Sequence, residues 1–195
     1  MNDYISERLE LLLERLRTTY DGIGHSSGRP YVYFIYEPGR EREVRRRVGE
    51  RFQSDEDLSF HYVDFLNITM KAIAGQEDRR RELLNDPSKA GSSAQAIVRL
   101  WAKKLSQEIN ERLVSPATAG RPVMILQGLA ALHPLGNPTS LMEALAEQEP
   151  RDPKTGLVVP IVLLVPGSRP PQSSRRYLFL DLENLRLDFY RGEEI

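Results

Sequence analysis

Arginine is the side chain in this sequence best suited to grip a phosphate or a carboxylate, and one segment concentrates it. Residues 167–176 hold Arg169, Arg175 and Arg176 and contain no acid. A guanidinium presents a planar fork of donors that pairs with phosphate or carboxylate oxygens. The segment follows an apolar run at 161–165, so we expect it at the carboxyl end of a strand, where open parallel sheets bind ligands. We therefore take these three arginines as candidate contacts for phosphate or for an acidic partner surface.

Two further candidates follow other predicted strands. Arg40 comes shortly after the strand expected at 31–36, and His133 follows the strand expected at 123–126. No nucleophile or metal ligand at a recognisable spacing accompanies His133, so a role in an interface is the simpler interpretation.

The sequence lacks the parts of a phosphate-binding loop. The turn after 31–36 reads Glu-Pro-Gly-Arg-Glu, with a single glycine, no lysine, and carboxylates where phosphates would sit. No Gly-Lys pair occurs anywhere in the chain. At the end of the third predicted strand stands Gln127, which is neutral and does not supply the charge that Mg²⁺ requires. We predict neither nucleotide hydrolysis nor a cofactor.

Other catalytic patterns occur only in the wrong context. Residues 24–28, Gly-His-Ser-Ser-Gly, match a nucleophile elbow, but they lie between a helix and a strand, the reverse of the required order. The three histidines show no metal-binding spacing, and cysteine is absent. Asp64, near the end of the second strand, is interpreted as a helix or turn cap. We predict no catalytic residues and no metal site, and a hydrolase centred on His133 or Asp64 stays open as an alternative.

The elements that position these residues follow from hydrophobic periodicity. The spacing of apolar residues predicts a single α/β domain over 1–195, with a mostly parallel sheet flanked by helices and a C-terminal antiparallel hairpin. Asn137-Pro138 is typical of a helix start, and Pro166-Gly167 is expected to end a strand. The predicted strands are 31–36, 58–65, 123–126 and 161–165 with a hairpin of 178–182 and 185–189; the predicted helical stretches are 5–16, 44–52, 68–84, 93–114 and one beginning at 138.

Composition limits the classes of partner. The chain has 195 residues, a formal net charge of −1 and no cysteine. The near-neutral charge argues against general affinity for nucleic acid, which needs a basic surface. The longest apolar run, 157–165, is far shorter than the roughly 20 residues of a membrane-spanning helix. We expect a cytoplasmic protein with no membrane partner.

Taken in order, several segments resemble the BrxB family, a small subunit of the bacterial BREX anti-phage defence systems. Each segment alone is unspecific, and the resemblance rests on their succession along nearly the whole chain. The segments are 34–39 with 43–47, 128–135 running into 141–145, and 160–167 followed by 177–180 and 190–191.

This resemblance implies a core related in layout to P-loop proteins but without their phosphate machinery. It also implies a non-catalytic adaptor in a complex that restricts phage DNA, with the alkaline-phosphatase-like subunit PglZ as direct partner and only an indirect association with DNA. The alternative is a degenerate nucleotide- or nucleic-acid-binding module that uses the basic loop 167–176.

Overall fold

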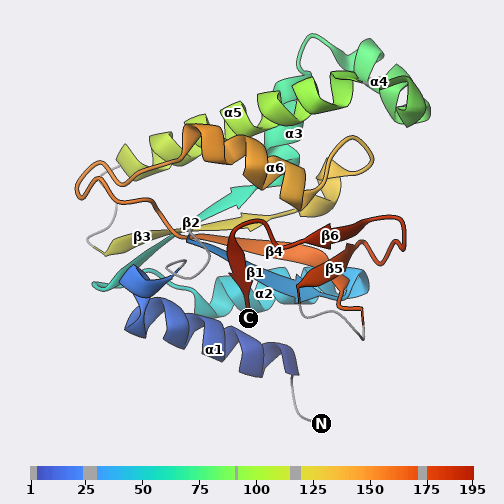
Figure 1. Cartoon of the computed structure of the whole chain (residues 1–195). Helices are drawn as coiled ribbons and strands as arrows, with labels where there is room; N and C mark the ends of the chain where they lie inside the picture. The colour runs from blue at the N-terminus through green and yellow to red at the C-terminus, as the bar shows by residue number, and fades with distance from the viewer. Residues whose placement is uncertain (1–3, 24–29, 91, 115–119, 171–174) are drawn as a thin grey trace.

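A mostly parallel sheet forms the centre of the computed structural model, which describes residues 4–23, 30–90, 92–114, 120–170 and 175–195 (Figure 1). Within these residues the strand order is β2-β3-β4-β1-β7, with neighbours parallel, and a β5-β6 hairpin pairs antiparallel with the end of β4. The predicted fold class is therefore confirmed. The strands are β1 (Tyr31–Tyr36), β2 (Leu58–Asp64), β3 (Arg121–Gln127), β4 (Ile161–Ser168), β5 (Arg176–Phe179), β6 (Arg186–Asp188) and β7 (Gly192–Glu194).

Helices cover both faces of this sheet. In Figure 1, α1 and α2 lie below it, α5 and α6 lie above it, and α4 stands away from the sheet beside the start of α5. None of the helices in the described ranges combines the length and apolar character needed to cross a lipid bilayer. The helices are α1 (Tyr4–Thr18), α2 (Glu41–Arg51), α3 (Phe65–Ile73), α4 (Glu77–Asn85), α5 (Ser92–Val114) and α6 (Pro138–Leu145), with short 3₁₀ turns η1 (Tyr20–Gly22), η2 (Pro38–Arg40), η3 (Pro87–Ala90), η4 (Leu129–Leu132) and η5 (Ala146–Gln148).

The central strands are apolar throughout because both of their faces are buried. Successive side chains of a strand point to opposite faces, so Tyr33 of β1 enters the upper core while Phe34 enters the lower core. Pairing of β1 with β4 runs from Tyr31 opposite Ile161 to Tyr36 opposite Pro166. The same two strands therefore contribute to both cores.

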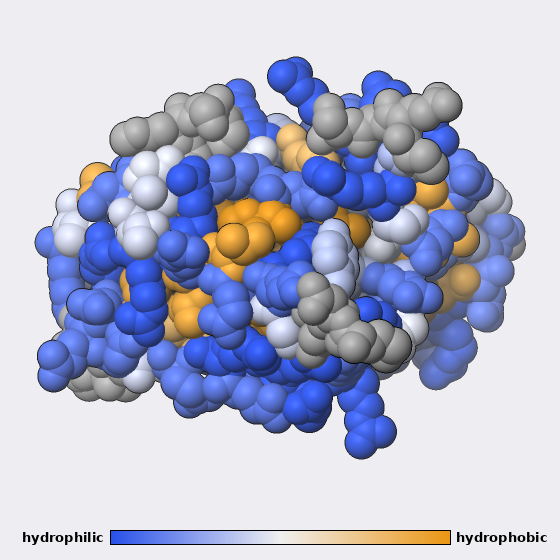
Figure 2. Space-filling view, turned by 90° about the horizontal axis from the view of Figure 1, so that it is seen from below, coloured by the Kyte–Doolittle hydropathy of each residue, from blue (hydrophilic) through white to orange (hydrophobic). Residues whose placement is uncertain are grey.

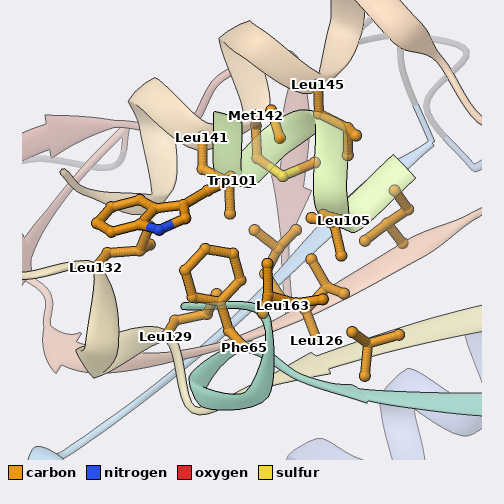
Figure 3. Packing of buried hydrophobic residues seen from close by; sticks show 14 of the residues in the cluster. Phe65, Trp101, Leu105, Leu126, Leu129, Leu132, Leu141, Met142, Leu145 and Leu163 are labelled. Atoms are coloured by element: carbon orange, nitrogen blue, oxygen red, sulfur yellow. The ribbon is translucent and has the colours of Figure 1, made fainter. Parts of the chain in front are cut away.

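The upper core is built by α3, α5 and α6 against the sheet. Figure 3 shows Trp101 of α5 beside Phe65, the first residue of α3, and their rings meet edge to face with centroids 5.9 Å apart. Leu105 continues the buried stripe of α5, one turn after Trp101. This buried stripe packs α5 along the sheet. The first turns of α5 extend beyond the sheet toward α4.

The predicted start of α6 is confirmed. Asn137 is the N-cap: its side chain accepts a hydrogen bond from the Ser140 amide at 2.9 Å, and its own amide donates to the Ser140 hydroxyl at 3.1 Å. This reciprocal capping satisfies two amides that the helix itself leaves free.

The stretch predicted as one helix, 68–84, is two helices. Phe65 belongs to α3 rather than to the preceding strand, and α3 ends at Ile73. Gly75 then adopts a positive φ of 80°, which glycine accepts without strain, and the chain turns before α4 begins at Glu77.

The end of β4 also differs from the expectation. Pro166 and Gly167 do not open a loop but continue the strand to Ser168, because β1 still pairs at Pro166 and β5 pairs with Gly167. The basic segment 167–176 is therefore partly strand, and its residues 171–174 lie outside the described ranges. The hairpin is shorter than predicted, and the edge beside β1 is filled by β7, a strand that the sequence did not indicate.

Candidate functional site

A cavity of about 270 Å³ opens where β1 and β4 end side by side. The chain leaves β1 toward α2 below the sheet, while it leaves β3 toward α6 above it (Figure 1). Ligands of open α/β sheets bind beside the strand ends at which such connections diverge. This carboxyl-edge cavity is lined by Tyr4, Ile5, Arg8, Ile35, Tyr36, Glu37, Arg40, Gly167, Ser168, Arg169 and Glu194.

Two of the five predicted contact residues, Arg40 and Arg169, line this cavity together. Each of them already has an acidic partner. The Arg40 Nε donates to the Glu43 carboxylate at 2.8 Å, and the Arg169 guanidinium pairs with Glu194. The cavity thus contains guanidinium groups, as predicted, but their charge is balanced within the chain.

Arg8 is a third arginine of the cavity, and it joins three parts of the fold. Its Nη1 donates to the Ile35 carbonyl at 2.6 Å, its Nη2 donates to the Ile195 carbonyl, and Nη2 lies 3.7 Å from the Glu194 carboxylate. The guanidinium also covers the Phe34 ring, with Cζ 4.5 Å from the ring centroid. Arg8 therefore fastens the C-terminal strand β7 to α1 and β1.

Glu194 is the acid at the centre of these contacts. Its side chain is only 7% exposed, and burial raises the pKa of its carboxyl group, while the nearby Arg169 and Arg8 act in the opposite direction. Burial likewise lowers the pKa of Arg8. Arg8 and Glu194 thus form a buried ion pair in which each charge offsets part of the cost of removing the other from water.

Neither Arg8 nor Glu194 was among the predicted site residues. They are 186 positions apart in the sequence (194 minus 8), and β7 spans only three residues with no apolar alternation. The sequence around either residue does not predict the contact between them. The only local signal is that Arg8 is one of the charged positions that interrupt the apolar residues of the first helix.

The remaining candidates of the basic segment lie at the start of β5, with Arg176 its first residue and Arg175 directly before it. The Arg176 Nε donates to the Asp188 carboxylate on β6 at 3.0 Å, and Arg175 is exposed. The segment contains no acid of its own, but folding brings Asp188 and Glu194 to it from the C-terminal strands. Its arginines remain about half exposed, at 53% for Arg169 and 54% for Arg176.

His133 lies apart from these arginines. It is exposed at the end of η4 and does not line the carboxyl-edge cavity.

Asp64 is the N-cap of α3, accepts from the Leu66 amide at 3.1 Å and pairs with Arg45 at 2.5 Å, so its interpretation as a cap is confirmed. The elbow-like residues 24–28, with His25, lie outside the described ranges.

His61 is the other histidine of the described chain. It lies on β2, and its Nε2 is 2.8 Å from the Ser59 hydroxyl. Burial, followed by the nearby positive charge of Arg112, lowers the pKa of His61. Among the described residues no group of three or more histidine, aspartate or glutamate side chains comes together to hold a metal ion.

Comparison with known proteins gives no match to a family, a curated protein or a solved structure. The functional argument therefore rests on the sequence and on the geometry described above.

Proposed function

We propose that this chain is a non-catalytic adaptor subunit of a bacterial BREX defence complex and that it docks on the alkaline-phosphatase-like subunit PglZ. The family resemblance of the sequence suggests the complex and the partner. The observation that supports an adaptor over a ligand-binding enzyme is that the arginines of the carboxyl-edge cavity already contact carboxylates of the chain, Glu43 and Glu194.

A phosphate site at this edge would need free amides and a free cation. The turn after β1 begins with Glu37 and Pro38, and proline carries no amide hydrogen. The arginines that reach the cavity are occupied by Glu43 and Glu194. An incoming phosphate would have to displace these carboxylates, so the edge is better suited to holding the fold together.

The surface around the two lower helices is mostly hydrophilic. Figure 2 views the molecule from this side and shows a mainly hydrophilic surface with hydrophobic patches, the most prominent near the middle of the view. The exposed large apolar side chains of α1 are Tyr4 and Leu11, at 64% and 58%. Scattered apolar residues of this kind are normal on a protein surface, so we expect any partner of this face to meet mainly polar and charged side chains.

The proposal is tested by co-expressing this chain with the PglZ subunit encoded in the same operon and passing the purified proteins through size-exclusion chromatography. We expect a complex that survives physiological salt. Separate elution at concentrations of tens of micromolar would contradict the proposal.

The same preparation decides the nucleic-acid alternative. The chain alone is titrated with a DNA duplex at low salt, beside a variant in which Arg169, Arg175 and Arg176 are replaced by alanine. Binding by the unmodified chain that this variant loses, with a flatter salt dependence, would favour the alternative. The ion pairs of Arg169 and Arg176 lead us to expect no measurable binding by either protein.

A further inference from the structure

Arg80 is a buried charge on α4, the helix that stands away from the sheet (Figure 1). The residue is only 4% exposed. Charged residues are almost never buried to this extent without a partner, because removal of an ion from water is costly. Asp152, another buried charged residue, follows this rule: its carboxylate accepts from the Lys154 amide and the Thr155 hydroxyl, each at 2.9 Å.

Arg80 lacks such compensation within the described residues. Its Nη1 is buried and has no hydrogen-bond partner, and its side chain forms no ion pair there. Within the described part of the chain the guanidinium lies against the Trp101 ring, whose centroid is 5.8 Å from the Arg80 Cζ. Burial, followed by the like charge of Arg79, lowers the pKa of Arg80.

The acids of α4 do not supply the missing charge. Asp78 pairs with Arg81 at 2.9 Å, and the Glu77 carboxylate accepts from the Gly75 amide at 3.0 Å. Two of the three acids of the helix therefore serve other groups, and among the described residues no acid, Glu82 included, forms an ion pair with Arg80.

A cavity of about 190 Å³ lies beside Arg80, between α4 and α5. Part of its wall is apolar, from Leu83, Ile97 and Leu100, and the cationic part comes from Arg79 and Arg80. The remaining lining residues are Gln76, Ser93 and Ala96. A short apolar stem that ends in an anion matches these walls.

We infer that this cavity between α4 and α5, the α4–α5 cleft, is the docking site for an acidic side chain, aspartate or glutamate, of a partner protein. The carboxylate pairs with Arg80 and Arg79 while its aliphatic stem contacts Leu83, Ile97 and Leu100. This deepens the proposed function, and rests on it only in naming PglZ as the partner.

Charge complementarity favours a protein carboxylate over a nucleic acid. A polyanion needs an extended basic surface, and α4 carries Glu77, Asp78 and Glu82 beside its three arginines. These acids repel a phosphate backbone, whereas a single carboxylate that enters the cleft meets the uncompensated guanidinium directly.

The matched pair of variants for a test is Arg80→Met and Arg81→Met. Methionine keeps the aliphatic stem of arginine and removes the charge, and Arg81 is the neighbouring arginine, exposed and already paired with Asp78. We expect Arg80→Met to unfold at a temperature higher by roughly 2–4 °C, because an uncompensated buried charge has been removed. A clear fall in its melting temperature would show that Arg80 stabilises the fold, and would overturn the inference.

The ligand chemistry is tested on the free chain with N-acetyl-hexaglutamate at low ionic strength as the probe. We expect the peptide to raise the melting temperature of the unmodified chain and of Arg81→Met, but not that of Arg80→Met. An equal response of all three proteins would overturn the inference, whatever the behaviour of PglZ. A DNA duplex that discriminates between the variants where the peptide does not would assign the cleft to nucleic acid and equally overturn it.

Binding to purified PglZ, measured by calorimetry, then separates this inference from the proposed function. We expect Arg80→Met to weaken binding at least about 10-fold and Arg81→Met to change it less than about 2-fold. If PglZ binds all three proteins equally, the proposed function stands and the α4–α5 cleft is not its docking site. If PglZ binds none of them while hexaglutamate discriminates, the cleft stands and the partner is wrong.

Discussion

Glu194 shows at the scale of a single residue how this chain uses charge. Its carboxylate lies between Arg8 and Arg169, so one buried acid from β7 is shared by arginines from α1 and from the end of β4. The sequence of the basic segment 167–176 suggests an unpaired positive charge, but this suggestion is wrong. The counterion of the segment comes from a strand that lies more than 15 residues further along the chain.

Glu194→Gln gives a prediction about pH. Burial holds the pKa of Glu194 above its unfolded value, so the native state binds this proton more readily than the unfolded state. The contribution of Glu194 to stability is therefore fully present below the unfolded pKa and is lost as pH rises through the folded pKa. We expect the stability of the unmodified chain, measured relative to Glu194→Gln, to increase as pH falls from 7 to 4.5. Urea unfolding of both proteins at several pH values checks this, and a difference that shrinks toward acid would contradict it.

Arg80 and Glu194 differ in whether the chain supplies an oppositely charged partner. Both are buried ions, but Glu194 has two guanidinium partners within the chain, whereas Arg80 faces an aromatic ring and a cavity. A buried ion that the fold pairs has its charge compensated within the chain, whereas one that the fold leaves unpaired points to a ligand.

At the scale of the elements, the junction between β4 and β5 depends on one glycine. Gly167 faces the β5 backbone, and a Cβ at this position would overlap the carbonyl oxygen of Leu178. We expect Gly167→Ala to lower the free energy of unfolding by about 1–3 kcal/mol, because two paired strands have to move apart. Denaturant titration measures this.

Gly49→Ala is the matched control for this substitution. Gly49 lies inside α2, and a Cβ there meets nothing within 4 Å. Alanine in a helix interior is favoured over glycine by roughly 0.5–1 kcal/mol, so this variant should be more stable than the unmodified chain. If both variants behave alike, the close approach of β5 is not what constrains Gly167.

The elements that could be predicted from sequence are those with strong local signals. The aromatic and β-branched run of 31–36 gave β1 with its bounds, and Asn137-Pro138 gave the first turn of α6. The elements that were missed depend on distant partners: β7 is a strand only because the edge of β1 accepts it, and Pro166 stays in β4 only because β5 folds back onto the strand end. The P-loop-like relationship of the core stays a prediction.

The candidate site was predictable only in part for the same reason. Arg40 and Arg169 were placed correctly at the ends of β1 and β4 because the ends of parallel strands meet at one edge. Arg8 and Glu194 were missed, since an ion pair between the first helix and the last strand leaves no pattern in the sequence. The burial of Arg80 was missed because its helix reads as a solvated, charged segment.

At the scale of the whole molecule, β1 and β4 join the two cores, and this predicts that the chain unfolds as one unit. Trp101, the single tryptophan, reports on the upper core, whereas Leu9 of α1 is fully buried in the lower core. We expect Leu9→Ala to lower the free energy of unfolding by about 2–5 kcal/mol. Alternate residues of β1 and β4 pack into the two cores, so both cores should unfold together. Trp101 fluorescence and far-UV circular dichroism should therefore report the same lowered midpoint of the unfolding transition.

Leu11→Ala is the control on the same helix. Leu11 is 58% exposed, and its truncation should change stability by less than about 0.5 kcal/mol. If Leu9→Ala leaves the Trp101 transition in place and circular dichroism shows a separate earlier step, the lower layer unfolds on its own. The chain would then contain two cooperative units, because side chains that alternate along β1 and β4 would not be enough to couple the layers on either side of the sheet.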